Sequence, residues 1–398
     1  MYTKAQEVPR LRIDPAHAYG GNVSEYFETV EYIPLETTKE SLFGDVYEIV
    51  VTDSSYVISD IDTRSIYFFS HSGKFITKVK NLIWFFHERV KNQIVVGKFD
   101  DDPAKEEFIY YSLQGKKLKS RPMKIDSNRP ADFFEMEHST PLGNDYFLNC
   151  NSCDVTDPAN KNRLPCYFLS IYKNNQLHKQ LIPAVEEFST AISRIWGSVT
   201  PPTDVQNGSF YVSTPLDYRV FKVNKDTAIQ LFQFIFPQNR VLPKEVIESN
   251  DVNYIDSLQD AGLRKETLIL NLVNISLTGS KLFFKILPGS YRITFNNSIN
   301  EYQYNFVYDT SSQKLISFDR MTPDSLSSFL PIMSEGSKHK GLLRNNEHLY
   351  GYISSLALFA SKEATQNKNP QYPPVLQQYF KTQNRKSNPV IVKMKLKD

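Results

Sequence analysis

The sequence predicts an all-β fold, specifically a six-bladed β-propeller of four-stranded antiparallel blades with few short helical insertions. The chain has 23 Tyr and 27 Phe but only 15 Gly, and aromatic side chains fit the half-buried surface of a pleated sheet. A unit of strand, turn, strand, turn and strand occurs near the N-terminus, and it recurs along the 398 residues. Small repeated sheets that cannot bury their own faces pack against one another, and radial closure leaves no open ends.

The repeated unit is clearest at residues 55–79. Tyr56, Ile58, Ile66 and Phe68 fall on alternating positions of two strands, which is the period of a half-buried strand. Polar turns separate the strands, and the second turn contains a Gly, which tolerates the positive φ of a tight hairpin. This stretch therefore predicts three consecutive antiparallel strands.

The same unit recurs along the rest of the chain. Copies cover residues 92–121, 145–182, 209–234 and 302–318, and a partial copy at 349–359 precedes a closing strand at 388–397. The stretches 151–165 and 235–300 are interpreted as long insertions between these strands. Short helices are expected at 242–250, 256–266 and 373–383, where apolar residues follow helical spacing and Pro stands near two of the starts.

The two ends of the folded chain are expected to meet. Pro34 lies in an extended run, and Pro belongs on an edge strand because it cannot donate to a ladder. We therefore expect residues 27–35 to pair beside 389–397 and close the ring. Residues 1–25 are then an N-terminal extension, and 26–398 form a single propeller domain.

The segment 32–79 resembles the first blade of a family of six-bladed β-propeller proteins, NHL-repeat-like, that is abundant in gut Bacteroidetes. The residues that carry the resemblance are 33–38, 41–44, Asp60 and 72–75 near the start, with weaker likeness at 218–223, 242–245 and 388–392. Many members are exported lipoproteins, so the resemblance implies a periplasmic or outer-membrane-anchored protein whose signal peptide and lipid-bearing Cys precede this numbering. The Gly-rich segment that often follows the family's first blade is absent here, so no role of it transfers.

Charge and hydropathy exclude two classes of partner. Lys and Arg number 46 against 44 Asp and Glu, a formal charge of +2, and no basic block suggests binding to nucleic acid or attraction to a membrane. No window of 18 apolar residues predicts a transmembrane helix.

The most motif-like cluster is Cys150, Cys153 and Cys166. Three thiolates joined by His138 or His178 would suit zinc, although a complete four-ligand spacing is absent. A redox pair is a second reading, and it normally opens a helix. The alternatives are small buried thiols at the base of a loop, or a disulfide that pins this loop in an oxidising compartment.

Aromatic and acidic residues give two further candidates. Trp84, His87 and Trp196 would form a ligand-binding surface if exposed on loops, because such rings stack on a sugar or a peptide. The alternative is core packing, which large aromatic residues favour. The acidic run 100–102 suits calcium in charge but lacks EF-hand spacing, so a solvated loop is the alternative.

The sequence contains no nucleophile elbow, phosphate loop or His-Glu-x-x-His motif, and no catalytic residue or cofactor is assigned. We expect an exported, monomeric, non-catalytic propeller that binds a glycan, a peptide or a partner protein through its loops or axial channel. The alternative function is a metal-dependent hydrolase or lyase, similar to a lactonase, with calcium or zinc at the channel mouth.

Overall fold

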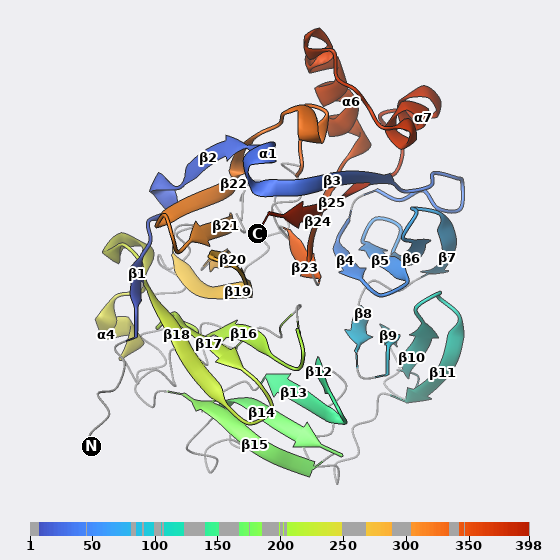
Figure 1. Ribbon diagram of the computed structural model, residues 1–398. Coiled ribbons are helices and arrows are strands. Elements are labelled where there is room, and N and C mark those ends of the chain that lie inside the picture. The colour runs from blue at the N-terminus through green and yellow to red at the C-terminus, as the bar shows by residue number, and fades with distance from the viewer. Residues whose placement is uncertain are drawn as a thin grey trace, which may run out of the picture. The chain divides into compact units, whose positions relative to one another are not determined.

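The structure is a computed structural model that describes residues 8–44, 46–80, 85–89, 91–98, 105, 107–122, 140–150, 167–174, 176–184, 199, 202, 205–248, 268–288, 304–333, 342–345 and 347–397. The chain forms two compact units. Unit 1 comprises residues 1–20 and 140–320, and unit 2 comprises 21–139 and 321–397. Six sheets are found, and Figure 1 labels their strands.

Unit 2 contains three four-stranded sheets with antiparallel neighbours. The first blade consists of β4 (Glu48–Val51), β5 (Ser55–Asp60), β6 (Ser65–Ser70) and β7 (Phe75–Lys80). The second consists of β8 (Phe85–Glu88), β9 (Gln93–Lys98), β10 (Glu107–Ser112) and β11 (Lys117–Pro122). The closing blade consists of β23 (Leu343–Asn345), β24 (His348–Ile353), β25 (Val390–Leu396) and β3 (Phe27–Pro34).

Unit 1 carries the other three sheets. The third blade consists of β12 (Thr140–Gly143), β13 (Tyr146–Cys150), β14 (Tyr167–Lys173) and β15 (Gln176–Pro183). The fourth consists of β16 (Phe210–Ser213), β17 (Arg219–Val223), β18 (Ala228–Ile235) and β1 (Arg10–Arg12), which runs parallel to β18. The fifth has five strands: β19 (Ile269–Thr278), β20 (Lys281–Pro288), β21 (Tyr304–Asp309), β22 (Lys314–Thr322) and β2 (Tyr19–Asn22).

Burial follows the position of a strand in its sheet. All six residues of β5 are buried, as are the first five of β6, because the central strands of a blade are covered on both faces. The outer strand β11 is almost wholly exposed. This gradient, together with six small sheets, is that of a six-bladed β-propeller, which confirms the predicted fold class.

The predicted pairing of the two chain ends is also confirmed. β3 pairs antiparallel with β25 from Pro34 opposite Val390 to Phe27 opposite Leu396. The N-terminal strand thus supplies the outer strand of a sheet whose other strands come from the C-terminal part of the chain. Pro34 ends this outer strand, where its missing N–H costs no ladder hydrogen bond.

The helices within the described residues are short. Among these residues the α-helices are α1 (Val23–Tyr26), α4 (Lys244–Ile247), α6 (Ser355–Ala364) and α7 (Pro374–Thr382), and 3-10 turns occupy Pro15–His17, Gln238–Arg240, Ser325–Ser327 and Gln366–Lys368. The helices expected at 242–250 and 373–383 are confirmed by α4 and α7, and 256–266 lies outside the described residues. The partial strand copy at 349–359 is wrong in its second half, because α6 begins after β24 where the Ser354 side chain accepts from the N–H of Ala357.

The interpretation of 235–300 as an insertion is also wrong. Residues 269–288 form β19 and β20, the first two strands of the fifth blade. Most of the residues of β19 and β20 whose burial is described are buried, and polar residues such as Asn271, Asn274 and Lys285 interrupt the apolar ones, so the two sequences do not show the simple alternation of a half-buried strand. The turn between them has only two residues, of which Gly279 takes a positive φ of 55°.

Candidate functional site

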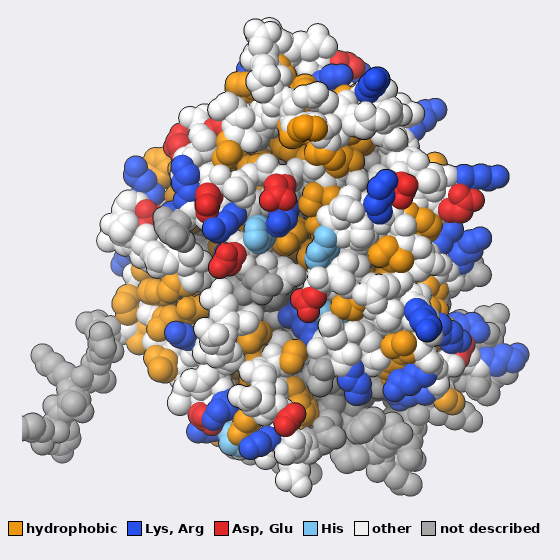
Figure 2. Space-filling model, turned by 45° about the vertical axis from the view of Figure 1, so that its right-hand side comes forward, with side chains coloured by type: hydrophobic (Ala, Val, Ile, Leu, Met, Phe, Trp, Pro, Cys, Tyr) orange, Lys and Arg blue, Asp and Glu red, His pale blue; other side chains and the backbone are white. Residues whose placement is uncertain are grey.

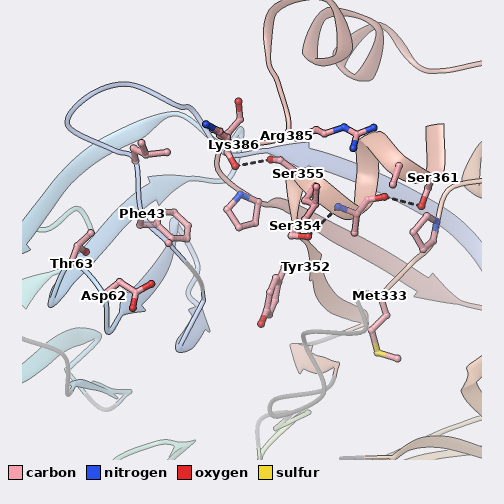
Figure 3. Close-up of a pocket in the computed structure, with 18 residues that line it drawn as sticks. Phe43, Asp62, Thr63, Met333, Tyr352, Ser354, Ser355, Ser361, Arg385 and Lys386 are labelled. Carbon is pink, nitrogen blue, oxygen red and sulfur yellow. Dashed lines mark hydrogen bonds between the residues drawn. The ribbon is translucent and has the colours of Figure 1, made fainter. Parts of the chain in front are cut away.

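A groove with a volume of about 1090 Å³ lies within unit 2. Figure 3 shows it between the first blade and the start of α6. The first blade contributes the loop 42–44 and the β5–β6 turn, and the closing blade contributes the end of β24, the first half of α6 and the segment 385–389.

The first-blade wall is held by short-range polar contacts. The Asp60 carboxylate accepts from the Thr63 backbone N–H at 2.9 Å and from its hydroxyl at 2.6 Å, which fixes the β5–β6 turn. A Cβ on Gly44 would lie 2.3 Å from an Asp62 carboxylate oxygen. A larger residue at position 44 would therefore require the Asp62 side chain to turn away from the loop 42–44.

The opposite wall is anchored at the first residue of α6. The buried Ser355 hydroxyl lies 2.6 Å from the Tyr379 hydroxyl and donates toward the carbonyls of Ser387 and Asn388 at 2.7 and 2.6 Å. These contacts tie α6 to α7 and to the start of β25. The next residue, Leu356, is 57% exposed and lines the groove.

The rim carries both signs of charge. The Arg385 guanidinium is paired with the Glu363 carboxylate, with the shorter N–O distance at 2.6 Å. The adjacent Lys386 is exposed and has no ion-pair partner among the described residues, whereas Asp62 stands on the first-blade wall. The groove thus presents one uncompensated cation near a mainly apolar and hydroxyl-bearing lining.

Residues that carry the family resemblance form hydrogen bonds next to the groove lining. The buried Asn388 amide donates to the carbonyls of Glu36 and Ser41 at 2.9 and 2.8 Å, and its oxygen accepts from the Phe43 N–H at 3.2 Å. The Ser41 hydroxyl also donates to the Glu36 carbonyl at 2.7 Å. The resemblance therefore marks a structural joint between the first and closing blades.

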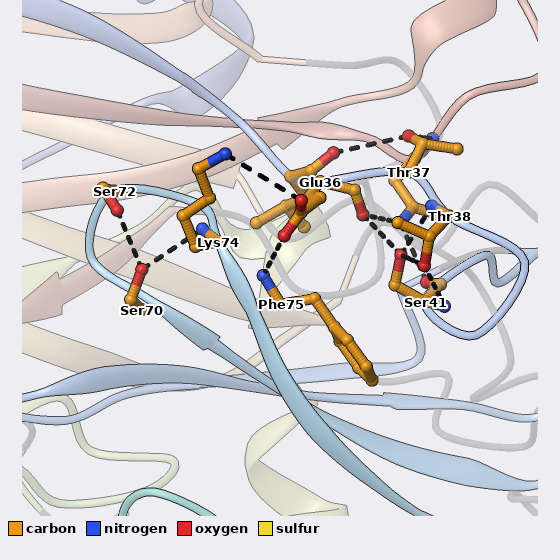
Figure 4. Close-up of polar contacts among 10 residues, drawn as sticks. Glu36, Thr37, Thr38, Ser41, Ser70, Ser72, Lys74 and Phe75 are labelled. Atoms are coloured by element: carbon orange, nitrogen blue, oxygen red, sulfur yellow. Dashed lines mark hydrogen bonds and ion pairs between the residues drawn. The ribbon is translucent and has the colours of Figure 1, made fainter.

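A second part of this joint reaches the β6–β7 turn, as Figure 4 shows. The Glu36 carboxylate accepts from the Phe75 N–H at 2.8 Å and lies 3.9 Å from the Lys74 ammonium. Gly73 takes a φ of 80°, and a Cβ there would lie 2.1 Å from the Pro34 carbonyl oxygen. The Gly requirement at this turn is thus steric as well as conformational.

Of the three predicted ligand-binding residues, the structure describes His87. Trp84 and Trp196 lie outside the described residues, so their proposed role stays a prediction. His87 is half-buried in β8, and its Nε2 lies 3.1 Å from the Asn92 side-chain oxygen. Burial lowers the pKa of His87, and this residue does not line the groove.

Of the three cysteines of the predicted thiol cluster, the structure describes Cys150. Cys150 ends β13 as expected, and Cys153, Cys166 and His138 lie outside the described residues. Burial raises the pKa of the Cys150 thiol to about 12. His178 lies 3.0 Å from the Asp226 carboxylate instead, and the residues with described positions form no group of three or more His, Cys, Asp or Glu that could hold a metal ion.

Leu42, Leu356 and Lys386 were not anticipated as site residues. The loop 41–44 carries part of the resemblance, but the strand copy expected at 349–359 includes the first half of α6, so this expectation does not indicate the second wall of the groove. Ser354 followed by a run that ends in Lys362 and Glu363 is the pattern of a capped helix that would have indicated it.

The six sheets and the joined chain ends define a propeller protein with a groove beside its closing blade. A family model described as a domain of unknown function, DUF4934, matches residues 11–395, and the chain belongs to this family. No curated protein matches the sequence.

Three solved structures match the chain at low sequence identity. An exported-protein candidate from Bacteroides fragilis NCTC 9343 has 14% identity and a TM-score of 0.55, with 98% of this chain and 100% of that chain covered. A DUF4221 family member from Bacteroides vulgatus ATCC 8482 has 8% identity and a TM-score of 0.38, covering 93% and 99%. A streptogramin B lyase has 9% identity and a TM-score of 0.33, covering 94% and 99%. The last two scores are too low to support an inference.

Within the described part of the chain, no helix is both long and apolar enough to cross a membrane.

Proposed function

We propose that this protein is an exported, non-catalytic binding propeller whose groove in unit 2 holds a polypeptide segment that presents an aliphatic side chain. The observation that carries the proposal is that Leu42 and Leu356, which are 44% and 57% exposed, both line the groove. Exposed aliphatic side chains that gather in a concave site mark a binding surface rather than a random surface composition.

A peptide fits this lining better than a glycan does. The two aromatic rings at the groove, Phe43 and Tyr352, are each only 5% exposed, so neither offers a face on which a sugar ring stacks. The described lining combines small apolar residues with serine and threonine hydroxyls, which suit a peptide side chain and its flanking backbone groups. Asp62 is the lone carboxylate there, which supports binding rather than acid–base chemistry.

Export is supported by two likenesses. The resemblance of residues 32–79 is to a family with many exported lipoproteins, and the solved structure with a TM-score of 0.55 is described as an exported-protein candidate. A lipid anchor ahead of this numbering belongs to the same proposal.

The test is a peptide array of 15-residue segments probed with the purified protein, run in parallel with a glycan array. We expect peptide binding that Leu356→Asp weakens at least tenfold, because a carboxylate would enter the apolar part of the groove. Val375→Asp is the matched control, since Val375 is 47% exposed on α7 and does not line the groove.

Binding to glycans alone, or peptide binding that both variants weaken equally, would contradict the proposal. Thermal unfolding of each variant confirms that the substitution leaves the fold intact.

A further inference from the structure

A different surface of unit 2, the outer edge of the second blade, has the properties of a strand-acceptor site. β11 is the last strand of its sheet and pairs only with β10 among the described strands. Residues 117–120 are all exposed, and Leu118 is 52% exposed. An edge strand presents a row of unpaired N–H and C=O groups that another extended chain can pair with.

This edge is strongly cationic. Lys116, Lys117, Lys119 and Arg121 lie within residues 113–122, which contain no acidic residue, in a chain whose formal charge is only +2. Figure 2 shows Lys and Arg side chains gathered on the right-hand side, to which the second blade belongs. Charge complementarity at this edge therefore favours an acidic segment.

Two of these cations are held in place. The Lys119 ammonium lies 4.6 Å from the centroid of the Tyr110 ring, and the Arg121 Nε donates to the Tyr110 hydroxyl at 2.7 Å. Neither Lys116 nor Lys117 has an ion-pair partner among the described residues. Because side chains that are already ordered lose less entropy on binding, a carboxylate partner would gain from this arrangement.

The chain itself shows that blade edges of this protein accept additional strands. β2 pairs with β22 as the fifth strand of its sheet, and Arg10–Arg12 pair in parallel with β18 as the fourth strand of theirs. These additions bury Ile13 and Ala18 in the core of unit 1. The edge of a blade thus has the twist and spacing that strand addition requires.

We propose that the outer edge of β11 binds an extended acidic peptide segment as an additional strand. The backbone groups of β11 pair with the segment, its carboxylates meet the lysines, and an aliphatic side chain contacts Leu118. The lysines also repel β11 of a second copy, so they prevent edge-to-edge pairing of the protein with itself while admitting an acidic partner.

Another exposed edge shows why charge selects β11. On β15, Leu177 is 54% exposed and residues 176–180 are all exposed. There, however, His178 faces Asp226, and the only formal cation in this stretch is Lys179. β15 therefore offers a similar edge with far less positive charge, which makes it the internal control.

The probe is a fluorescein-labelled ten-residue peptide of alternating Glu and Val, measured by fluorescence anisotropy at 150 mM salt. We expect the peptide to bind and the double variant Lys116→Glu/Lys117→Glu to weaken this binding about tenfold or more. The two introduced carboxylates would repel the carboxylates of the peptide. Lys179→Glu/Lys222→Glu makes the same change of charge on unit 1 and should leave the affinity unchanged. The groove variant Leu356→Asp should also leave it unchanged, which separates this site from the proposed function.

Backbone pairing is tested separately from charge. Two further peptides carry N-methyl groups either on every Glu or on every Val. In an extended strand alternate N–H groups point to the same edge, so one methylated peptide should lose at least tenfold in affinity and the other should bind as the parent does.

Equal affinity of both methylated peptides would show charge attraction without strand pairing and would overturn the proposal. Absence of binding of the parent peptide, or its retention by Lys116→Glu/Lys117→Glu, would overturn it as well. Vesicles of phosphatidylglycerol and soluble polygalacturonate serve as competing polyanions. If either binds through Lys116 and Lys117 and the peptide does not, the partner is a membrane or a glycan, and the proposal is wrong.

Discussion

Two buried polar side chains, Asn388 at the closing blade in unit 2 and Lys285 in the fifth blade in unit 1, are accommodated in different ways. Each blade receives a strand from the N-terminal part of the chain, β3 in the closing blade and β2 in the fifth. In the closing blade the buried Asn388 side chain is matched to three backbone groups. In the fifth blade Lys285 is only 4% exposed, and the buried Ser276 hydroxyl has no hydrogen-bond partner among the described residues.

This difference indicates that the buried Asn388 side chain raises the free energy of unfolding, whereas the buried Lys285 charge lowers it. A buried polar group that is fully hydrogen-bonded rigidifies its surroundings, and loss of its side chain leaves several backbone groups unsatisfied. A buried ammonium is disfavoured by desolvation, even where it has partners. The joint at the closing blade should therefore be sensitive to truncation, and the fifth blade should gain from replacement of its charge.

The largest effect is expected at the joint. Asn388→Ala would leave the buried Ser41 carbonyl and the buried Phe43 N–H without this partner, and the Glu36 carbonyl with the Ser41 hydroxyl as its donor. We expect a loss of about 4 kcal/mol in the free energy of unfolding, measured by urea denaturation. Asn384→Ala is the control, because Asn384 is exposed and should cost less than about 1 kcal/mol. A small effect of Asn388→Ala would show that the joint is not what holds the closing blade.

In the fifth blade, replacing a buried polar side chain should raise the free energy of unfolding instead of lowering it. Burial lowers the pKa of Lys285 from 10.5 to about 7. Between these values the unfolded chain binds a proton here that the folded chain does not, so the free energy of unfolding rises with pH across this window. Below pH 7 the folded protein bears the full cost of the buried charge.

Lys285→Met should therefore stabilise the protein by about 2 kcal/mol at pH 7. The gain should shrink as the pH rises toward 10, because the wild-type amine is then already neutral. Urea denaturation at pH 7, 8, 9 and 10 measures it. A gain that is constant with pH would mean that packing, and not charge, distinguishes the two proteins, and a loss of stability would reverse the comparison.

The closing blade also contains a buried hydroxyl, that of Tyr32, which has hydrogen-bond acceptors. Tyr32 of β3 is 4% exposed, and its hydroxyl lies 3.1 Å from the carbonyl oxygens of both Leu330 and Pro331. Tyr32→Phe should cost about 1 to 2 kcal/mol, since it leaves buried acceptors unpaired. Tyr19→Phe, at a residue that is 60% exposed, should be neutral, and urea denaturation measures both variants.

The strand pattern and the pairing of the chain ends could be predicted from the sequence because both depend on local rules. Residues 55–60 and 65–70 are two short apolar runs, rich in aromatic and β-branched residues and separated by a polar turn, and Pro34 restricts its strand to an edge. These features fix an element without reference to the rest of the molecule.

The site depends on contacts that no local pattern reports. Asn388 meets Ser41 across 347 residues of chain, so its role follows from the fold and not from its neighbours in sequence. The strands at 269–288 carry Asn271, Asn274 and Lys285 among their apolar residues, which obscures the period of a strand. The start of α6, Ser355 to Leu358, alternates small and large side chains as a strand can, so this stretch by itself does not indicate this wall of the groove.

The smallest effect is expected where the N-terminal segment only adds to a blade. Arg320 on β22 donates to the carbonyl of Ala18, just before β2, and to that of Ala16 at 3.0 Å. These bonds are part-buried or exposed, so Arg320→Gln should lower the global free energy of unfolding by less than about 1 kcal/mol. It should instead speed amide hydrogen exchange in residues 10–22, because the segment opens locally while the blade stays folded. A loss as large as that of Asn388→Ala would mean that the added strand supports its blade as strongly as β3 supports the closing blade, and the distinction between completing a sheet and extending one would not hold.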